Sequence, residues 1–442
     1  MEIGIRLVAQ NYDIRTGKII EEKIIKDKKV SKARTLKELG YIHIEQIDFL
    51  QKIQEFKISH QIMLNHLTKC PICDSKTHKL GMIKSKFHAI LTDHKVSIQK
   101  VACKCGWVGR STIEGIYGSP MHPDLLKKQA ALQGSKESYK KSSVTLNAES
   151  GCNRAINSHS QIFKTVKAIG ESLEKIKTSD DYVKKVVSAE TIIANIDGGH
   201  IKARGNNRSF EAMIATVYRP ESLKYVDKNH NILISKTSVA LAKDDEQSAI
   251  KALFKTACKT QGMDLSTNVI CLADGAANCW SIAHSIEDKC QNLTFILDWF
   301  HISIKFKNIA IPDEHKELYD KVKWCLWHGR VDIALMRMEQ LKSSVKDIAT
   351  VAKLKKLTTY IKNNENGIIN YGKRRRMGLV YTSNLAEGTV NTLINERQKG
   401  KQKMLWGREG AHNVLQIRAS IRSKSWDSDW RKVESNIYKI AA

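Results

Sequence analysis

Two short apolar segments, each followed by Asp-Gly, constrain the fold of this chain more than any other feature of its sequence. The segment Thr191–Ile196 is followed by Asp197, and the segment Asn268–Ala273 is followed by Asp274. Both segments are apolar enough to be buried strands, and the glycine after each aspartate allows a sharp turn. Because a buried carboxylate without a partner costs several kcal/mol, an aspartate in such a place is more often bound to a cation.

The segments around these two predict a mixed α/β domain. The expected elements follow the order β-β-β-α-β-α-β, in which three leading strands form a meander and each later strand is reached through a helix. This order is typical of the ribonuclease H-like fold, a mixed sheet with helices on both faces. The further elements are strands at Ser209–Tyr218, Ile232–Leu241 and Leu293–Leu297, and helices at Glu246–Gln261 and Ala277–Cys290.

In this order the first strand lies next to the fourth, so we expect Asp197 and Asp274 to project side by side. Asp298 follows the fifth strand and would lie one strand further out, which makes Asp274 the better second carboxylate. Two adjacent carboxylates repel each other, and a pair of Mg²⁺ (or Mn²⁺) ions removes that conflict. Two such cations can activate a water or a 3′-hydroxyl and stabilise the leaving oxygen of a phosphodiester.

A two-metal site of this kind normally needs a third carboxylate from elsewhere in the chain. The best candidate is Glu387, on a helix predicted over residues 383–397, where it shares one stripe with Val390 and Ile394. The alternative is structural, because aspartates commonly follow strands in turns and a glutamate in a first helical turn stabilises the helix dipole. The predicted catalytic and Mg²⁺-binding residues are Asp197, Asp274 and Glu387.

The motifs that contain these acids are similar to those of a known family. They are Asp197-Gly198-Gly199, Leu272-Ala273-Asp274-Gly275-Ala276, Ile296-Leu297-Asp298-Trp299-Phe300-His301 and Ser383-Asn384-x-x-Glu387-Gly388. They resemble the DDE transposases of bacterial insertion sequences, and the ISKra-type group, related to Mutator-like transposases, is the most similar. The tail from Lys399 to Gly410 also resembles that group. The resemblance covers residues 185–425 well and the region before them more loosely.

The resemblance implies a ribonuclease H-like catalytic domain in which Asp, Asp and Glu bind the metal ions. It also implies an all-helical insertion between the fifth strand and the glutamate helix, which residues 306–380 would supply. Mutator-like enzymes carry a Cys- or Asp-x-x-His pair after the second catalytic aspartate, and here that pair is Asp298 and His301. We expect an accessory role for this pair, with His301 positioning DNA or the active-site helix. Plain helix packing is the alternative.

Two tight pairs of cysteines predict a structural Zn²⁺ site. Cys70 and Cys73 form one chelating turn, Cys103 and Cys105 form the other, and the gap between them leaves room for a hairpin. Four thiolates in two knuckles suit tetrahedral zinc, and a site closed by four protein ligands leaves no position for a reacting water. We therefore expect fold support and DNA docking rather than catalysis. Four unligated cysteines are the alternative, and a histidine could replace one thiol: His78, His88 or His94.

The charge balance favours nucleic acid as the partner. Lys and Arg number 73 against 46 Asp and Glu, a formal net charge of +27, and such an excess attracts polyanions. Basic segments flank the Glu387 helix, where phosphate contacts would add salt-dependent affinity without reading sequence. A solvated face is the other interpretation. The predicted DNA-contacting residues are Arg374, Arg375, Arg376, Arg397, Lys399, Lys401, Lys403 and Arg408.

By pattern, the chain divides into six parts. They are an N-terminal accessory domain (1–66), a zinc ribbon (67–112), a helical, helix-turn-helix-like DNA-binding domain (113–185), the first part of the catalytic domain (186–305), the helical insertion (306–380), and the catalytic helix with a basic C-terminal part (381–442). The first part begins with a predicted hairpin, Ile3–Ala9 and Lys18–Ile25. Helices are predicted at 122–133, 135–149 and 153–177. The last two look like a helix-turn-helix whose second helix would read DNA, although plain helical packing fits them equally well.

Cysteine usage and hydropathy bear on where the protein works. The chain has no apolar run of about 18 residues, so no membrane span is predicted. Ten cysteines, six of them scattered, favour a reducing bacterial cytoplasm with one metal site over a disulfide scaffold.

Together these features predict a transposase that acts on double-stranded DNA, at element ends and at the target. We expect hydrolysis of a phosphodiester at an element end, followed by attack of the freed 3′-hydroxyl on target DNA. Because two ends must be held at once, we expect a homodimer or a larger synaptic assembly. The alternatives are a ribonuclease H-like nuclease or resolvase that cuts without joining, and a domesticated, inactive zinc-containing DNA-binding protein.

Overall fold

The computed structural model describes residues 3–110, 113, 115, 120–205, 208–227, 230–383, 391–399 and 404–440. These residues fall into two compact units, which we describe separately. Unit 1 comprises residues up to 132, residues 137–165 and the last residues from 434, whereas unit 2 comprises residues 133–136 and 166–433. The six-part division expected from the sequence is finer than this and stays a prediction.

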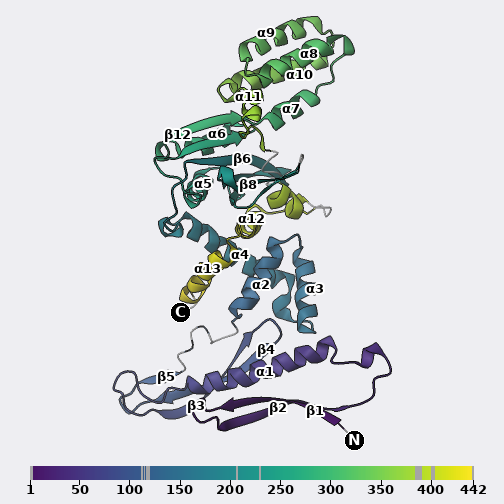
Figure 1. The fold of residues 1–442 in the computed structure, drawn as a ribbon. Coiled ribbons are helices and arrows are strands. Elements are labelled where there is room, and N and C mark those ends of the chain that lie inside the picture. Colours follow the sequence, from purple (N-terminus) through teal and green to yellow (C-terminus); the bar gives the residue numbers. More distant parts are fainter. Residues whose placement is uncertain are drawn as a thin grey trace. The chain divides into compact units, whose positions relative to one another are not determined.

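Unit 1 is built from a long hairpin, a long helix, a small antiparallel sheet and shorter helices (Figure 1). The predicted N-terminal hairpin is confirmed, and Gly17 adopts a φ of 68° in its turn. Its strands run further than expected because the ladder continues past two bulges. The elements are β1 (Ile3–Tyr12), β2 (Ile19–Val30), α1 (His43–Leu64), β3 (His78–His88), β4 (Asp93–Ala102), β5 (Val108–Arg110), α2 (Pro123–Gly134), α3 (Tyr139–Ser150) and the start of α4 (His159–Thr178).

The ends of α3 follow from its flanking residues. The Ser138 side chain accepts a hydrogen bond from the backbone N–H of Lys141 at 3.2 Å, and Gly151 ends the helix with a φ of 69°. Ser138 as N-cap explains why α3 begins later than the predicted residue 135, since a capping residue lies outside the helix. The predicted helix over 153–177 also begins late, at His159, after a short 3₁₀ turn.

A five-stranded mixed sheet forms the centre of unit 2, which confirms the expected mixed α/β class. Its order is β10-β7-β6-β11-β12. Strands β6, β11 and β12 run parallel, whereas β7 is antiparallel to β6 and β10 to β7. The first strand of this sheet therefore lies beside the fourth, as predicted. The strands are β6 (Thr191–Lys202), β7 (Ser209–Tyr218), β10 (Thr237–Leu241), β11 (Asn268–Ala273) and β12 (Asn292–Leu297).

Alternating side chains give this sheet two buried faces. On β6, Ile192 and Ala194 belong to a core that includes residues of α5 (Ser248–Thr260) and α6 (Ala277–His284), whereas Ile193 belongs to a second core. Figure 1 shows α7 and α11 next to the sheet, with α8, α9 and α10 beyond them. The helices that contribute to the second core are α7 (Trp299–Lys307), α8 (Asp313–Trp327), α9 (Val331–Ser344), α10 (Ile348–Asn363) and α11 (Tyr371–Arg376).

The third strand differs from its prediction. The span Ile232–Leu241 is not one strand, because β8 (Leu223–Asp227) and β9 (His230–Leu233) form a separate hairpin and only β10 joins the sheet. The backbone N–H of Ile234 donates to the carbonyl of Ser222 at 2.9 Å, which continues the pairing of Leu233 with Leu223, so this part of the span pairs with β8 instead of with the sheet.

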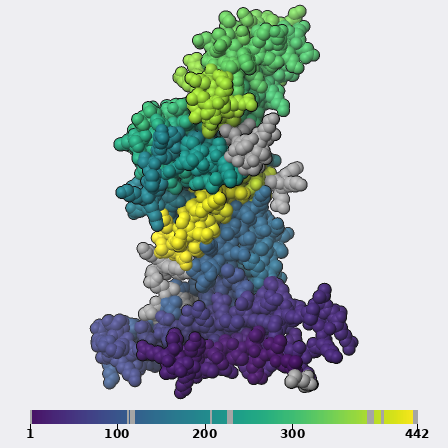
Figure 2. Space-filling model, viewed as in Figure 1, coloured from purple at the N-terminus to yellow at the C-terminus, as the bar shows by residue number. Residues whose placement is uncertain are grey.

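The last two described helices are α12 (Arg408–Arg422) and α13 (Trp426–Ile440). Helix α12 packs on the edge strand β10, where the Gln416 side chain donates to the carbonyl of Ala240 at 2.7 Å. In the space-filling view the C-terminal segment, in yellow, lies directly against the teal residues of the sheet region (Figure 2). Of the predicted helix 383–397, residues 384–390 lie outside the described ranges, and η8 (Asn391–Lys399) is a π-helix.

Neither unit supplies a membrane span: within the described ranges, no helix is both long and apolar enough to cross a bilayer.

Candidate active site and metal centre

Three aspartates lie at one level of the sheet, on three adjacent parallel strands. Residue Ala273 of β11 is paired with Ile196 of β6 on one side and with Leu297 of β12 on the other. Neighbouring strands are about 4.8 Å apart, so the middle aspartate is one strand spacing from each of the others. The residues that directly follow these three paired positions are Asp197, Asp274 and Asp298.

The three aspartates are near enough to one another for their charges to interact. Asp197 lies within β6, four residues after Ile193 of the second core, so the alternation of strand side chains places it on the face that carries α7 to α11. Asp274 and Asp298 follow the last residues of β11 and β12, and the charges of both act on Asp197.

Asp197 does not end its strand, contrary to the expectation. Strand β6 continues through Gly198 and Gly199 to Lys202, and Asp197 is paired with Ile214 of the antiparallel neighbour β7. What ends beside Asp197 is the parallel partner β11, at Ala273. On one side of β6 the hydrogen bonds to β7 continue past Asp197, and on the other side the pairing with β11 ends just before it. The backbone of Asp197 therefore keeps a regular strand conformation.

Burial and neighbouring charges act together on Asp197. Burial is the main cause that raises its pKa, and the charges of Asp274 and Asp298 raise it further. The charge of His301 and the backbone N–H of Gly198, which donates to Asp197 Oδ1 at 2.7 Å, lower the pKa without cancelling the rise. When Asp197, Asp274 and Asp298 are ionised, the nearby positive charge does not balance their negative charges.

The turn after β11 is fixed from two directions. Asp274 Oδ1 accepts a hydrogen bond from the backbone N–H of Ala276 at 2.9 Å, and the Tyr360 hydroxyl of α10 donates to the Asp274 carbonyl at 2.7 Å. Gly275 has a φ of 91°, and a Cβ there would lie 2.7 Å from Asn364 Oδ1. Only glycine fits this turn, which explains Gly275. The sharp turn expected at Gly198 does not occur, because Gly198 lies within β6.

Asp298 is committed to structural hydrogen bonds. It is only 1% exposed, caps α7 by accepting from the backbone N–H of Phe300 at 3.0 Å, and accepts from the backbone N–H of Ser383 at 3.1 Å. The Ser383 hydroxyl donates to its other oxygen, and His301 Nε2 lies 3.7 Å from that oxygen. These contacts favour an anchoring role for Asp298 over metal binding.

The predicted third acid, Glu387, lies outside the described residues, but the chain on both sides of it is anchored. Ser383 is bonded to Asp298, and Leu393 and Ile394 of η8 are fully buried. The buried guanidinium of Arg418 donates to the Leu393 carbonyl at 2.7 Å. Among the described residues, the acidic side chains alone do not complete a three-ligand site for one ion.

The predicted DNA-contacting residues divide by exposure. Arg375, Arg376 and Lys399 are exposed, and Arg374 is half-buried with its Nε donating to the Val380 carbonyl at 2.8 Å. Arg408 forms a two-point ion pair with Asp245, at 2.9 and 2.8 Å. Outside the described residues lie Lys401 and Lys403.

For Arg397 the structure contradicts the prediction of a phosphate contact. Its side chain is 3% exposed, its guanidinium lies over the Trp406 ring at 4.8 Å, and it donates to Gln133 Oε1 at 2.8 Å. A buried guanidinium that is already stacked and hydrogen-bonded cannot reach a DNA backbone, so Arg397 packs η8 against its neighbours.

Sequence reasoning missed a basic turn at the far end of β6. Lys202, Arg204 and Arg208 are exposed there, in the connection to β7. The Trp406 backbone N–H donates to the Lys202 carbonyl at 3.0 Å, and the Arg204 N–H donates to the Trp406 carbonyl at 2.9 Å. The turn therefore lies beside the predicted basic segment, and spacing alone could have placed its charges five to eleven residues after Asp197.

A second site, in unit 1, is formed by the four paired cysteines. Their sulfur atoms all lie within 4.8 Å of one another, with Cys70 to Cys105 at 3.7 Å and Cys73 to Cys103 at 3.4 Å. These distances exclude disulfides, whose sulfurs are about 2.05 Å apart. Hydrogen bonds from Ser75 are the main cause that lowers the pKa of Cys73 to about 6. Within the described ranges, no other group of three or more ligand residues is as close.

The histidines between the cysteine pairs do not belong to this cluster. His88 Nδ1 lies 2.7 Å from Asp93 Oδ1, and His94 packs against the Phe87 ring at 5.1 Å. The cluster thus contains thiols alone, and its donor set fits tetrahedral Zn²⁺.

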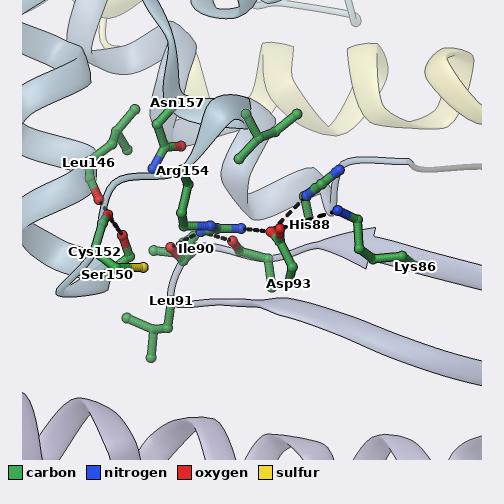
Figure 3. Close-up of polar contacts among 12 residues, drawn as sticks. Lys86, His88, Ile90, Leu91, Asp93, Leu146, Ser150, Cys152, Arg154 and Asn157 are labelled. Atoms are coloured by element: carbon green, nitrogen blue, oxygen red, sulfur yellow. Dashed lines mark hydrogen bonds and ion pairs between the residues drawn. The ribbon is translucent and has the colours of Figure 1, made fainter.

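An arginine holds the tip of the β3–β4 hairpin, which extends from the cysteine module. Arg154 donates to the carbonyls of Ala89 and Ile90, both at 2.8 Å, and to Asp93. Figure 3 shows the Arg154 side chain reaching toward Ile90 and Asp93. Burial opposes ionisation of Asp93, but hydrogen bonds from His88 and Arg154 outweigh it and lower its pKa to about 2. Because Arg154 lies between α3 and α4, the contact joins the hairpin to the helices of unit 1.

A scan of the chain against protein-family models found no match, and a search of the curated proteins found none either.

Proposed function

We propose that this protein is a DDE transposase, which cuts DNA at the ends of a mobile element and joins the freed 3′-hydroxyl to target DNA. The observation that carries the proposal is the position of Asp197 and Asp274, each directly after one of two paired residues of adjacent parallel strands and near enough for their charges to interact. The strand order supports a ribonuclease H-like catalytic domain. The helices α8 to α11, between β12 and Ser383, stand where a helical insertion is expected.

Asp197 and Asp274 would hold divalent cations, Mg²⁺ or Mn²⁺, with Glu387 as the third ligand that the resemblance to ISKra-type enzymes supplies. The donors are oxygen atoms. Burial is the main cause that raises the pKa of Asp197, the charges of Asp274 and Asp298 raise it further, and bound cations would offset both effects. The ions would supply activation of a water or a 3′-hydroxyl and stabilisation of the leaving oxygen. Backbone N–H groups of Gly198 and Ala276 orient the two carboxylates.

The residues around this pair have positioning roles in the proposal. Asp298 anchors Ser383 and so fixes where the chain leaves for Glu387. His301, whose charge acts on Asp197, would meet the phosphate of the scissile strand. The exposed charges of Arg375, Arg376 and Lys399 would bind the DNA backbone.

Unit 1 would serve DNA binding rather than chemistry. Four thiols would hold structural Zn²⁺ in a zinc ribbon. Helices α3 and α4, separated by Gly151, would read element ends in the manner of a helix-turn-helix. Two copies of the chain, or more, would hold the two element ends.

The decisive experiment removes one carboxylate at a time. The Asp197→Asn and Asp274→Asn variants should bind DNA as the wild type does and lose Mg²⁺-dependent nicking of a supercoiled plasmid that carries the natural flanks of the coding sequence. Asp288→Asn is the matched control, because Asp288 is an exposed acid of the same unit that pairs with Lys289 and should nick normally. Nicking retained by Asp197→Asn would overturn the proposal.

A second assay separates a transposase from a nuclease that does not join. An oligonucleotide with a pre-cut 3′-hydroxyl at the element end should be joined to plasmid DNA in Mg²⁺ or Mn²⁺. Cutting without joining would identify the protein as a nuclease or resolvase.

A further inference from the structure

One tryptophan of this chain is exposed. All eight tryptophans are in the described ranges, and Trp324 of α8 is the one with a largely exposed side chain, 61% of its surface. One turn later Trp327 packs against Trp299, with ring centroids 4.8 Å apart, inside an aromatic cluster. The aromatic core of these helices is therefore complete without Trp324.

The exposed ring of Trp324 packs against a neighbouring ring. Its centroid lies 4.3 Å from that of His328, one helical turn further on. His328 in turn pairs with Asn370 in an isolated β-bridge, and Asn370 caps α11 by accepting from the backbone N–H of Lys373 at 2.8 Å. Trp324 thus stands at the junction between the end of α8 and the start of the basic helix α11.

Two arginines of α11 lie along the side that meets this junction. A Cβ on Gly372 would lie 3.3 Å from His328 Cε1, so the Gly372 face of α11 is the one against α8. Residues three and four positions on share that face, and here they are Arg375 and Arg376, both exposed. In the described part of the chain, no carboxylate forms an ion pair with either arginine.

A large exposed indole on one helix, and exposed guanidinium groups on the helix that meets its end, form an unusual combination for water-facing surfaces, and exposed apolar groups of this size often mark binding sites. The positive charges of the arginines favour a polyanion as the ligand, and the exposed indole ring favours a flat apolar group that can stack on it. In a DNA duplex the flat faces of the bases are covered by stacking, whereas an unpaired base can stack on an aromatic side chain.

We propose that Trp324, His328, Arg375 and Arg376 form a binding surface for single-stranded DNA, on which an unpaired base stacks against Trp324 and the arginines bind its phosphates. The inference rests on the proposed function in that DNA is taken as the ligand. It adds that the protein holds unpaired nucleotides, such as those of a strand freed by cleavage, on α8 and α11.

The test compares the binding of a fluorescently labelled single strand and of its duplex by anisotropy. Trp324→Ala should weaken single-strand binding roughly five- to hundredfold, the range expected for one stacked base, and leave duplex binding within twofold. Trp324→Phe should retain most of the affinity. The control is Ile348→Ala on α10, an exposed apolar residue outside this surface, which should leave both affinities unchanged.

The contribution of Arg375 and Arg376 is tested by the salt dependence of single-strand binding. In Arg375→Gln and Arg376→Gln, the slope of log affinity against log salt concentration for the single strand should fall by about 0.7 per arginine, the value for one lost phosphate contact.

The proposal is overturned if Trp324→Ala binds single strands like the wild type, or if it weakens single-strand and duplex binding equally. It is also overturned if the variant changes only the oligomeric state, measured by light scattering, because the surface would then be an interface between copies. Failure of the transposase proposal looks different: Asp197→Asn would keep nicking DNA, while the effect of Trp324→Ala on the wild-type background would persist.

Discussion

At the scale of single residues, Asp197, Asp274 and Asp298 have similar neighbours in the sequence but different hydrogen-bond partners in the structure. Asp197 receives the backbone N–H of Gly198, the next residue of its own strand, whereas Asp274 receives that of Ala276 from the turn that follows. Asp298 instead receives N–H groups from its own helix and from Ser383, which is 85 positions away in the chain. The strand order already places Asp298 one strand further from Asp197. That its carboxylate accepts hydrogen bonds from Ser383 is seen only in the folded structure.

This difference predicts opposite results for two conservative changes. Asp298→Asn keeps an oxygen that can accept from Phe300 and Ser383, so DNA nicking should fall by no more than roughly 100-fold, as is usual for groups that orient metal ligands. Asp274→Asn should abolish nicking. Initial rates measured over a Mg²⁺ titration, with Mn²⁺ as a second metal, distinguish the two.

Asp298→Ala provides the structural comparison. It leaves the backbone N–H groups of Phe300 and Ser383 without an acceptor, and a buried donor left unpaired costs about 1–3 kcal/mol. The variant should lose stability as well as nicking, whereas Asp298→Asn should keep its stability. If Asp298→Asn were as inactive as Asp274→Asn while folding normally, Asp298 would be the second metal ligand.

At the scale of helices and strands, the pattern of the sequence predicted the order of the sheet but not every boundary. Apolar runs identify β6, β7 and β11, because a strand buried on both faces must be apolar throughout, whereas β12 is fully buried only at its last two residues. The separate β8–β9 hairpin was missed because Ile232 and Leu233 were assigned to the same strand as Thr237–Leu241, whereas in the structure they pair with Lys224 and Leu223.

The same limit explains the misassigned Arg397. Its neighbours in sequence are charged, and a basic run normally lies in solvent. Its partners in space are Trp406 and Gln133, the latter 264 positions away. A long-range contact of this kind cannot be derived from spacing, so the exposure of a basic residue is the least predictable part of the candidate site.

The contact between α4 and α12 gives a prediction for pH. Glu174 Oε2 lies 3.2 Å from His412 Nε2 and 3.7 Å from Lys243 Nζ. The His412 contact is the largest cause that lowers the pKa of Glu174 below 4.5, against the effect of burial. Folding therefore favours the ionised form, and its contribution to stability is present above pH 4.5 and is lost as the pH falls below that value.

Glu174→Gln should therefore destabilise unit 2 at pH 7, and the difference from the wild type should shrink as the pH falls from about 5 to about 3. Urea unfolding followed by tryptophan fluorescence measures this, because seven of the eight tryptophans are in unit 2. The control is Glu171→Gln, which removes an exposed acid from the same helix. A difference that stays constant over this pH range would contradict the assignment.

At the scale of the whole molecule, the two candidate metal sites require different ions and lie in different units. The thiol cluster is in unit 1, and the aspartates are in unit 2. Thiolates bind Zn²⁺ tightly, and oxygen ligands with few charges hold Mg²⁺ weakly. Removal of each ion should therefore have a separate effect, one on the fold and one on the reaction.

Cys70→Ser or Cys103→Ser should lose the zinc ion and unfold the cysteine module, because binding of a structural zinc is coupled to folding. Zinc content measured by mass spectrometry should fall from one ion per chain. Hydrogen exchange should increase over β3 to β5, which lie between or beside the cysteine pairs. Exchange in β6 and β11 should not change, since every ligand belongs to unit 1. Cys152→Ser is the matched control: it removes an exposed thiol of unit 1 outside the cluster. A Cys70→Ser protein that kept its zinc, or one in which unit 2 unfolded too, would show that the four cysteines do not form a separate structural site.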